Sequence, residues 1–451
     1  MLPFIDALSV VAIVVFASAV LGGPVEIQLL HQWRITWVGS GVVTIALLVI
    51  RHLLRPAPHI GQDLISRAQA FWSLTATREA LRATLITRAG VFLAGWLAVV
   101  TIGHAPSPDP PRGNPLAQLP GVWDATWYLG IASNGYRWAP DQPNVRVAFF
   151  PGFPVALRVV ARLLHLPDDE PAWLWTGVVV SVLCFWLALL VLHRFAEILV
   201  DADAATRAIW LTACYPFSLF YGQLYTESLF LLAAVAACYF LKRGRPLTAA
   251  IFGATVGLVR PTGVLVALPM AWDALVAMRS PDQRAPGRLA RTLVAVASPA
   301  VGLAAYAAYM KHVSGQWLAW MSAQVAWGRQ PRSPWMLLVE IADYVRAHGL
   351  TSYLHDRPYD VANIAAVVFA LGTVVPVARR FGPGLAAFVL LSVVIPLTAG
   401  GWLSIGRFTS VLFPMFIWLG AAATRPRVLL GVFAALEAVL ATLFFTDRPI
   451  Y

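Results

Sequence analysis

Long apolar stretches recur along this chain, and short basic segments join them. Each stretch has roughly 15–20 residues, which is close to the length that an α-helix needs to cross the hydrocarbon core of a bilayer. The chain of 451 residues is 59% hydrophobic and only 12% charged, and soluble domains could not bury that much apolar surface. The sequence therefore predicts an all-α polytopic protein of the cell membrane.

The number of stretches predicts about thirteen transmembrane helices. Arginines gather in the connections, as at Lys242-Arg243 and Arg379-Arg380, which is typical of cytoplasmic loops. The N-terminus is then cytoplasmic and the C-terminus external. This distribution accounts for the net charge of +11 without a nucleic-acid partner. The predicted spans are residues 4–22, 35–50, 86–103, 173–193, 207–222, 227–241, 247–259, 262–277, 292–310, 361–378, 384–400, 407–423 and 428–445.

The connections predict how the chain is organised. Two long connections, 104–172 and 311–360, fall on the external side, and an external tail, 446–451, follows the last span. Residues 56–85 mix arginines with apolar side chains, which predicts an amphipathic helix on the cytoplasmic face.

The short spans 247–259 and 262–277 are interrupted at Arg260-Pro261, so two half-helices that meet inside the membrane are an alternative to two full spans.

Asp124 lies in the most polar stretch between two spans, WDATWYLGIASNGYRWAPDQPNVRVAFFPGFP (123–154). It is flanked by Trp123 and Trp127, at the outer end of a preceding span. A partly desolvated carboxylate in such a position is suited to take a proton from a hydroxyl group, so we interpret Asp124 as a general base. The alternative is that Asp124 only caps the helix that begins near Ala125.

Three further charged residues lie within or beside apolar stretches. Glu227 enters a span, where an unpaired carboxylate at mid-membrane costs on the order of 2–3 kcal/mol. It either belongs to a site or begins a helix with Thr226 as N-cap. Arg260 and Arg407 carry guanidinium groups that match phosphate oxygens, which favours binding of a lipid phosphate. Alternatively, each of these arginines extends to the lipid headgroups or pairs with a carboxylate such as Glu227.

The second long connection carries Trp317, Trp320, Gln324 and Trp327 at helical spacing. This face either stacks on a sugar or lies among headgroups as an aromatic belt. Glu437, in the last span, is expected to pair with a neighbouring helix.

No nucleotide-binding or zinc-protease motif occurs, and the DxD spacing of Asp201-Ala202-Asp203 lies in a short connection without a nucleotide-binding context. We expect no cofactor and assign no metal ligand.

Six blocks in order resemble the phosphatidylinositol-glycan mannosyltransferase II (PIG-V type) family: WDATWYLGIASNGY, AFFPGFP, GQLYTESLF, RPTG, WMSAQVAWG and SIGRFTSVLFPMF. That family belongs to the GT-C membrane glycosyltransferases. The resemblance covers about residues 86–445, which would form the catalytic core. Residues 1–85 would be an extra transmembrane hairpin with the amphipathic segment.

The resemblance implies an inverting enzyme that moves mannose from polyprenyl-phosphate mannose to a lipid-linked or glycan acceptor at the external face of the bilayer. Asp124 matches the family's external-loop acidic residue and becomes the base. Arg407 and Arg260 would stabilise the leaving phosphate. Eukaryotic members tend to have a histidine a few residues after the aspartate, where this chain has Trp127. Further substrate contacts are expected from Trp123, Trp127, Tyr136, Tyr225, Glu227, Gln324 and Trp327.

The composition, rich in Arg, Ala, Val and Pro, suggests a bacterium with a GC-rich genome. The acceptor would then be a phosphatidylinositol mannoside, a lipoglycan or a cell-wall glycan. One alternative is transfer of arabinofuranose or another sugar from the same class of lipid donor. Another is a flippase or transporter of lipid-linked sugars, which would use the same arginines without bond chemistry.

Overall fold

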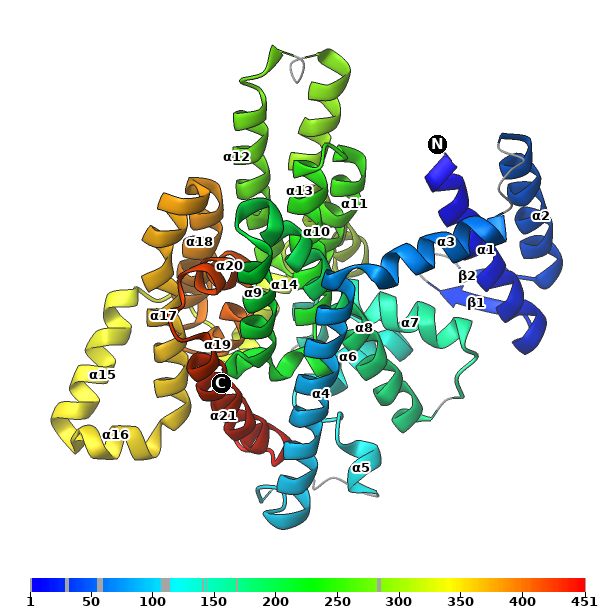
Figure 1. Cartoon of the computed structure of the whole chain (residues 1–451). Helices are drawn as coiled ribbons and strands as arrows, with labels where there is room; N and C mark the ends of the chain where they lie inside the picture. Colours follow the sequence, from blue (N-terminus) through cyan, green and yellow to red (C-terminus); the bar gives the residue numbers. More distant parts are fainter. Residues whose placement is uncertain are drawn as a thin grey trace.

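The computed structural model describes residues 2–28, 32–54, 60–106, 114–139, 142, 144–167, 169–281 and 285–450. In this part of the chain, eight helices are long and apolar enough to cross a membrane. They are α1 (Leu2–Gly22), α2 (Trp37–Leu54), α4 (Thr75–Thr101), α8 (Glu170–Leu199), α13 (Pro286–Ser314), α17 (Pro358–Phe381), α18 (Pro383–Gly400) and α21 (Pro426–Phe445). The predicted helical, multi-pass architecture is confirmed (Figure 1).

The predicted count of about thirteen spans is not confirmed. Several apolar stretches form helices of 10–14 residues, which reach only about 15–21 Å against a core about 30 Å thick. These are α9 (Ala202–Cys214), α11 (Pro246–Val259), α12 (Ala267–Ala277), which follows the 3₁₀ segment η3 (Pro261–Val266), and α20 (Phe413–Ala422).

A sharp bend replaces the predicted boundary between the spans 207–222 and 227–241. The 3₁₀ segment η2 (Pro216–Gly222) meets α10 (Glu227–Lys242) at 98°. If this bent pair counts as one span, the described residues contain nine. Pro216 opens η2 because proline lacks a backbone donor and cannot continue α9. The bend leaves residues 223–226 as a non-helical connection.

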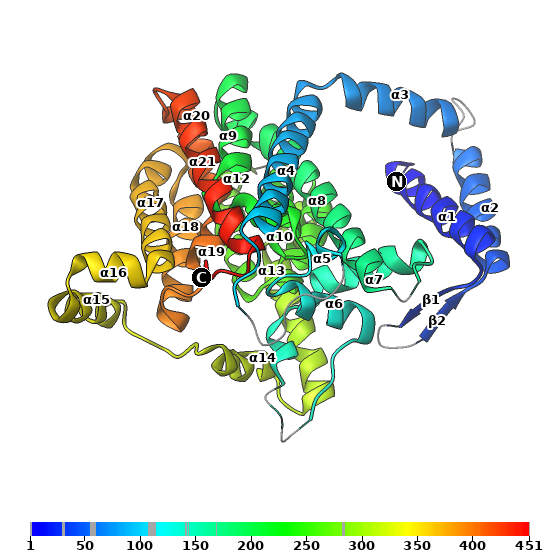
Figure 2. The ribbon, with the colours of Figure 1, turned by 90° about the horizontal axis from the view of Figure 1, so that it is seen from below.

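The N-terminal part lies to one side of the main body, and α3 (Ile60–Ser73) connects the two (Figures 1 and 2). A two-stranded antiparallel hairpin, β1 (Val25–Gln28) and β2 (Gln32–Ile35), joins α1 to α2 and was not predicted.

The amphipathic helix expected over 56–85 is shorter in the structure than predicted. Within the described residues α3 ends at Ser73, and α4 begins at Thr75, eleven residues before the predicted start of that span.

Ion pairs fasten α3 to the N-terminal helices. Arg51 Nε of α2 lies 3.3 Å from Asp6 Oδ1 of α1, and Arg51 Nη2 lies 2.5 Å from Asp63 Oδ2 of α3. Arg67 Nη2 lies 2.8 Å from the other oxygen of Asp6. Asp6, Arg51 and Asp63 are buried, so these charges stabilise one another away from solvent.

The main body is organised around α4, α8, α9, α10 and α21. Arg88 of α4 donates from Nη2 to Glu437 Oε1 of α21 at 2.7 Å, and Ser218 Oγ of η2 donates to the same oxygen at 2.6 Å. The prediction that Glu437 pairs with a neighbouring helix is confirmed. This pair fixes the bent segment η2 against two long helices.

The two long connections carry short helices that meet at one end of the body. The first contains α5 (Pro115–Gln118), α6 (Ala125–Asn134), η1 (Val145–Ala148) and α7 (Gly152–Leu163). The second contains α14 (Ala319–Ser322), η5 (Ala323–Trp327), α15 (Pro334–His348) and α16 (Leu350–Asp356), and the last two project outward (Figure 2). Phe150 packs against Trp320 with ring centroids 5.4 Å apart, which joins the two connections.

Candidate active site

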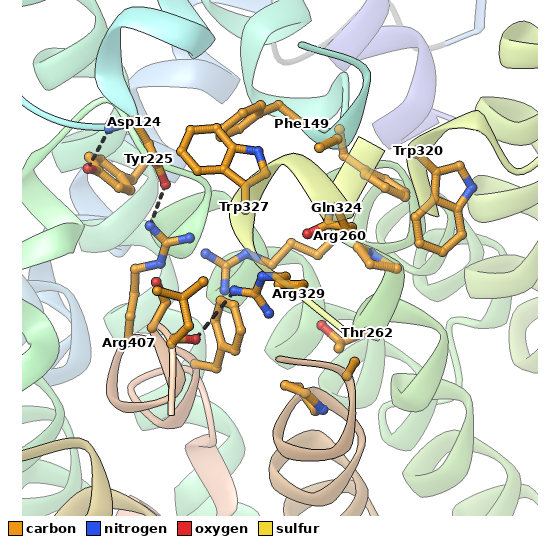
Figure 3. A pocket seen from close by; sticks show the side chains of 18 of the residues that line it. Asp124, Phe149, Tyr225, Arg260, Thr262, Trp320, Gln324, Trp327, Arg329 and Arg407 are labelled. Atoms are coloured by element: carbon orange, nitrogen blue, oxygen red, sulfur yellow. Dashed lines mark hydrogen bonds and ion pairs between the residues drawn. The ribbon is translucent and has the colours of Figure 1, made fainter. Parts of the chain in front are cut away.

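A cavity of about 630 Å³ lies where both connections meet the helix ends (Figure 3). Its walls come from the start of α6, η1, the connection before α10, η3, α14 with η5, the end of α18, and α19 (Ile405–Thr409). Two bulky or polar residues at its wall adopt the left-handed backbone that side chains disfavour: Trp123 has φ 57° and Ser404 has φ 60°. Such strained positions often occur at functional sites.

Asp124 directs its carboxylate to an arginine of a distant segment. Arg407 Nη1 donates to Asp124 Oδ2 at 2.7 Å, and the backbone N–H of Asp124 donates to the Tyr225 hydroxyl at 3.0 Å. Asp124 precedes α6 directly, but its side chain forms no capping hydrogen bond with that helix. The capping alternative therefore does not account for the carboxylate.

Glu227 is fully buried behind the cavity wall and faces two arginines. Its Oε1 accepts a hydrogen bond from Arg260 Nη2, and Arg407 Nε lies 3.0 Å from the same oxygen. The Arg407 Nε–H does not point at that oxygen, and neither this group nor Glu227 Oε2 forms a hydrogen bond. Thr226 does not cap α10 with its side chain but accepts from Arg260 Nε at 2.7 Å.

Three arginines surround one aromatic ring at the cavity wall. The guanidinium carbons of Arg260, Arg329 and Arg407 lie 5.2, 5.4 and 5.5 Å from the ring centroid of Phe408. With Asp124 and Glu227 as the nearby carboxylates, the group carries one more positive than negative charge. It is therefore suited to an anionic ligand.

Arg329 differs from the other two arginines. It forms no ion pair with any described residue, and its Nη2 donates only to the Leu403 carbonyl at 3.4 Å. Burial and the neighbouring Arg407 lower the pKa of Arg329 to about 10, so its side chain still carries a positive charge at neutral pH. Sequence analysis did not select Arg329, although it follows the WMSAQVAWG block by one residue.

Aromatic rings form another part of the wall. Trp127 stacks on Phe149 with centroids 6.0 Å apart, and Trp327 meets both rings edge-on at 5.9 and 5.7 Å. Flat aromatic faces of this kind can pack on the apolar face of a sugar ring. Gln324 and Trp320 also line the cavity, and Trp320 Nε1 is buried without a hydrogen-bond partner.

The structure brings most of the predicted site residues to this cavity. On the tryptophan face of the second connection, three residues line the cavity, namely Trp320, Gln324 and Trp327. The fourth, Trp317, is 56% exposed. The predicted residues that line the cavity are Trp123, Asp124, Trp127, Tyr225, Arg260, Gln324, Trp327 and Arg407.

Tyr136 does not line the cavity, in contrast to its expected substrate contact. Its hydroxyl donates to the Phe149 carbonyl at 2.6 Å, and its ring packs on Tyr306 with centroids 5.7 Å apart. Burial raises the pKa of the Tyr136 hydroxyl well above its ordinary value. Tyr136 thus supports the backbone that carries Phe149, a residue that sequence analysis did not select.

No group of three or more His, Cys, Asp or Glu residues that could hold a metal ion occurs in the described part of the chain. Asp201 of the DxD spacing accepts a hydrogen bond from the Ala204 backbone N–H at 2.7 Å and so caps α9. This interaction explains Asp201 as a structural residue.

Comparison with known proteins matches residues 115–280 to the family described as Mannosyltransferase (PIG-V). The chain is 31% identical over 183 residues to human GPI alpha-1,6-mannosyltransferase 2, covering 37% of this chain and 36% of that protein. It is 31% identical over 160 residues to GPI mannosyltransferase 2 of Yarrowia lipolytica, covering 35% of this chain and 41% of that protein. The chain thus matches less than half the length of these curated relatives.

Among solved structures, the oligosaccharyltransferase of Archaeoglobus fulgidus is similar with a TM-score of 0.38 and 14% identity, over 82% of this chain and 52% of that chain. The family match includes Asp124, Glu227 and Arg260. The resemblance inferred from the sequence blocks is therefore confirmed for residues 115–280, which match the PIG-V mannosyltransferase family.

Proposed function

We propose that this chain is an inverting GT-C glycosyltransferase that transfers mannose from polyprenyl-phosphate mannose to a glycolipid or cell-wall glycan at the external membrane face. The observation that carries the proposal is a single cavity that combines a carboxylate, Asp124, with three arginines and an aromatic wall. A base, a phosphate site and a surface for a sugar are the parts that such a transfer needs.

The transfer needs one base and no general acid. The acceptor hydroxyl attacks C1 of mannose on the face opposite the phosphate, and its proton passes to Asp124. The bond between C1 and the phosphate oxygen breaks, and its electron pair leaves with the lipid phosphate. Because that phosphate is already a stable anion, positive groups beside it lower the barrier without donating a proton. Arg260 and Arg407 would act in this way.

The walls also fit the chemistry of the donor. Beside the arginines, apolar side chains of η3 and α18 line the cavity, among them Leu265, Ile395 and Pro396. This surface is suited to the first isoprenoid units of the lipid. Trp127, Phe149 and Trp327 would pack against the sugar, and Gln324 would hydrogen-bond its hydroxyl groups.

Transfer by the purified full chain tests this function. Wild type is incubated with synthetic polyprenyl-phosphate mannose and a panel of lipid acceptors, and Asp124→Asn is compared with Asp343→Asn. Asp343 is an exposed carboxylate of α15 that pairs with Arg346, so it controls for the loss of one negative charge. We expect transfer by wild type and Asp343→Asn, and a loss of at least about a hundredfold in kcat for Asp124→Asn with donor binding retained.

Full transfer by Asp124→Asn would refute the base assignment. Binding of the intact donor by wild type without transfer to any acceptor would favour a different sugar or a lipid carrier.

A further inference from the structure

The three arginines of the cavity are not equivalent as anion sites. Arg260 is paired with Glu227, and Arg407 is paired with Asp124. An incoming phosphate would have to compete with these carboxylates. Arg329 has no carboxylate partner among the described residues, and its one hydrogen bond, to the Leu403 carbonyl, is long at 3.4 Å.

The backbone around Arg329 directs its side chain into the cavity. Arg329 follows Gly328, which has φ 68°, a left-handed conformation that ends η5 and that glycine adopts without strain. The side chain then passes over the end of α18 at Gly400. A Cβ atom added at Gly400 would lie 2.9 Å from Arg329 Cγ and 3.1 Å from its Nη1. Figure 3 shows the side chain among those of Arg260 and Arg407.

Arg329 is half-buried, and a charge that is partly withdrawn from solvent without a counter-ion is costly, so an anion that enters the cavity would reduce that cost. The guanidinium groups of Arg260 and Arg407 contact the same ring, Phe408, and both act electrostatically on Arg329, so a phosphate on Arg329 also lies within their field. Phosphate binding to Arg329 needs no ion pair of the cavity to break.

We propose that Arg329 is the primary ligand of the donor phosphate, and that Arg407 first serves to hold the Asp124 carboxylate. This assignment rests on the proposed function for the identity of the donor, and it deepens that function by naming the residue that captures the phosphate. Arg260 and Arg407 then contribute mainly as negative charge develops on the leaving phosphate.

The test measures binding rather than turnover, with the full chain in detergent. The two probes are a sugar-free polyprenyl phosphate and the matching uncharged polyprenol, and their affinity ratio isolates the contribution of the phosphate. We expect wild type to prefer the phosphate. Arg329→Gln should lose about tenfold to a hundredfold of this preference, as expected for a charge-assisted hydrogen bond, with polyprenol affinity unchanged.

Arg332→Gln is the matched control, because Arg332 lies on the same connection, is 43% exposed and pairs with Glu340. It should keep the wild-type ratio. Gly400→Ala supplies a second variant that keeps every charge but displaces the Arg329 side chain, and it should lower phosphate affinity several-fold while leaving polyprenol affinity unchanged. Arg329→Lys should recover part of the preference.

A wild-type ratio in Arg329→Gln would overturn the assignment, as would equal losses in Arg329→Gln and Arg332→Gln. The outcomes separate this assignment from the proposed function. If wild type transfers no mannose but its preference for phosphate depends on Arg329, the assignment stands and the function falls. If Asp124→Asn abolishes transfer while Arg329→Gln binds the phosphate like wild type, the function stands and the assignment falls.

Discussion

Replacing Glu227 with glutamine tests whether the charges around the cavity form one balanced unit. Glu227 is fully buried, and one of its oxygens faces both Arg260 and Arg407. Removing one partner of a buried pair typically costs about 3–5 kcal/mol, because a charge is left without compensation. Glutamine keeps a carbonyl oxygen near the same place, so we expect the lower end, about 3 kcal/mol.

The assay is thermal unfolding of the purified protein in detergent. With an unfolding entropy of about 2.1 cal/mol/K per residue, a loss of about 3 kcal/mol lowers the midpoint of this chain by about 3 °C. Glu340→Gln is the control. It breaks the exposed pair with Arg332, which is expected to contribute about 0–1 kcal/mol, so its midpoint should fall by no more than about 1 °C.

A double variant adds a stricter requirement. Arg260→Gln in the Glu227→Gln background removes one uncompensated positive charge, so the double variant should be more stable than the sum of the two single effects predicts. If Glu227→Gln unfolds at the same temperature as Glu340→Gln, or if the two single effects simply add, the balanced-charge interpretation is refuted.

Two further predictions concern topology and substrate contact. A cysteine at Asn134 should react with a membrane-impermeant thiol reagent added outside intact cells, and a cysteine at Asp203 should not. Wild type measures the labelling of the native cysteines, and the opposite labelling pattern would invert the proposed orientation. Trp320→Phe keeps an aromatic ring at this position, although a smaller one, and removes the unpartnered indole N–H, so KM for the substrate that it contacts should rise about fivefold. An unchanged KM for both donor and acceptor would restrict Trp320 to a packing role.

The sequence indicated the membrane-spanning architecture because apolar length is a direct consequence of bilayer thickness. It did not indicate where an apolar stretch breaks. The predicted span 407–423 is divided in the structure between α19 and α20, because hydropathy does not register a local turn of the backbone. The bend between η2 and α10 was not predicted for the same reason, although Pro216 and Gly222 mark the limits of η2.

The candidate site was partly predictable because charges in an apolar setting are costly and therefore conspicuous. Arg260 and Arg407 were found in this way. Asp124 was selected instead because it lies between two tryptophans in the most polar stretch between two spans. Arg329 was missed because it lies in a polar connection, where an arginine is ordinary, and only the fold carries it into the cavity. Tyr136 was placed wrongly because its sequence neighbours do not reveal that its hydroxyl reaches the Phe149 carbonyl.

The charge balance of the cavity depends on two different parts of the chain. The segment that matches the family, residues 115–280, supplies Asp124, Glu227 and Arg260, which together carry one net negative charge. These three site residues alone would not attract an anionic donor. Arg329 and Arg407 lie beyond that segment and make the net charge of the site positive. The 2.7 Å contact from Arg407 to Asp124 joins residues 283 positions apart. The proposed base therefore lies in the family segment, whereas the arginine that holds it and the proposed phosphate ligand come from later parts of the chain that fold against this segment.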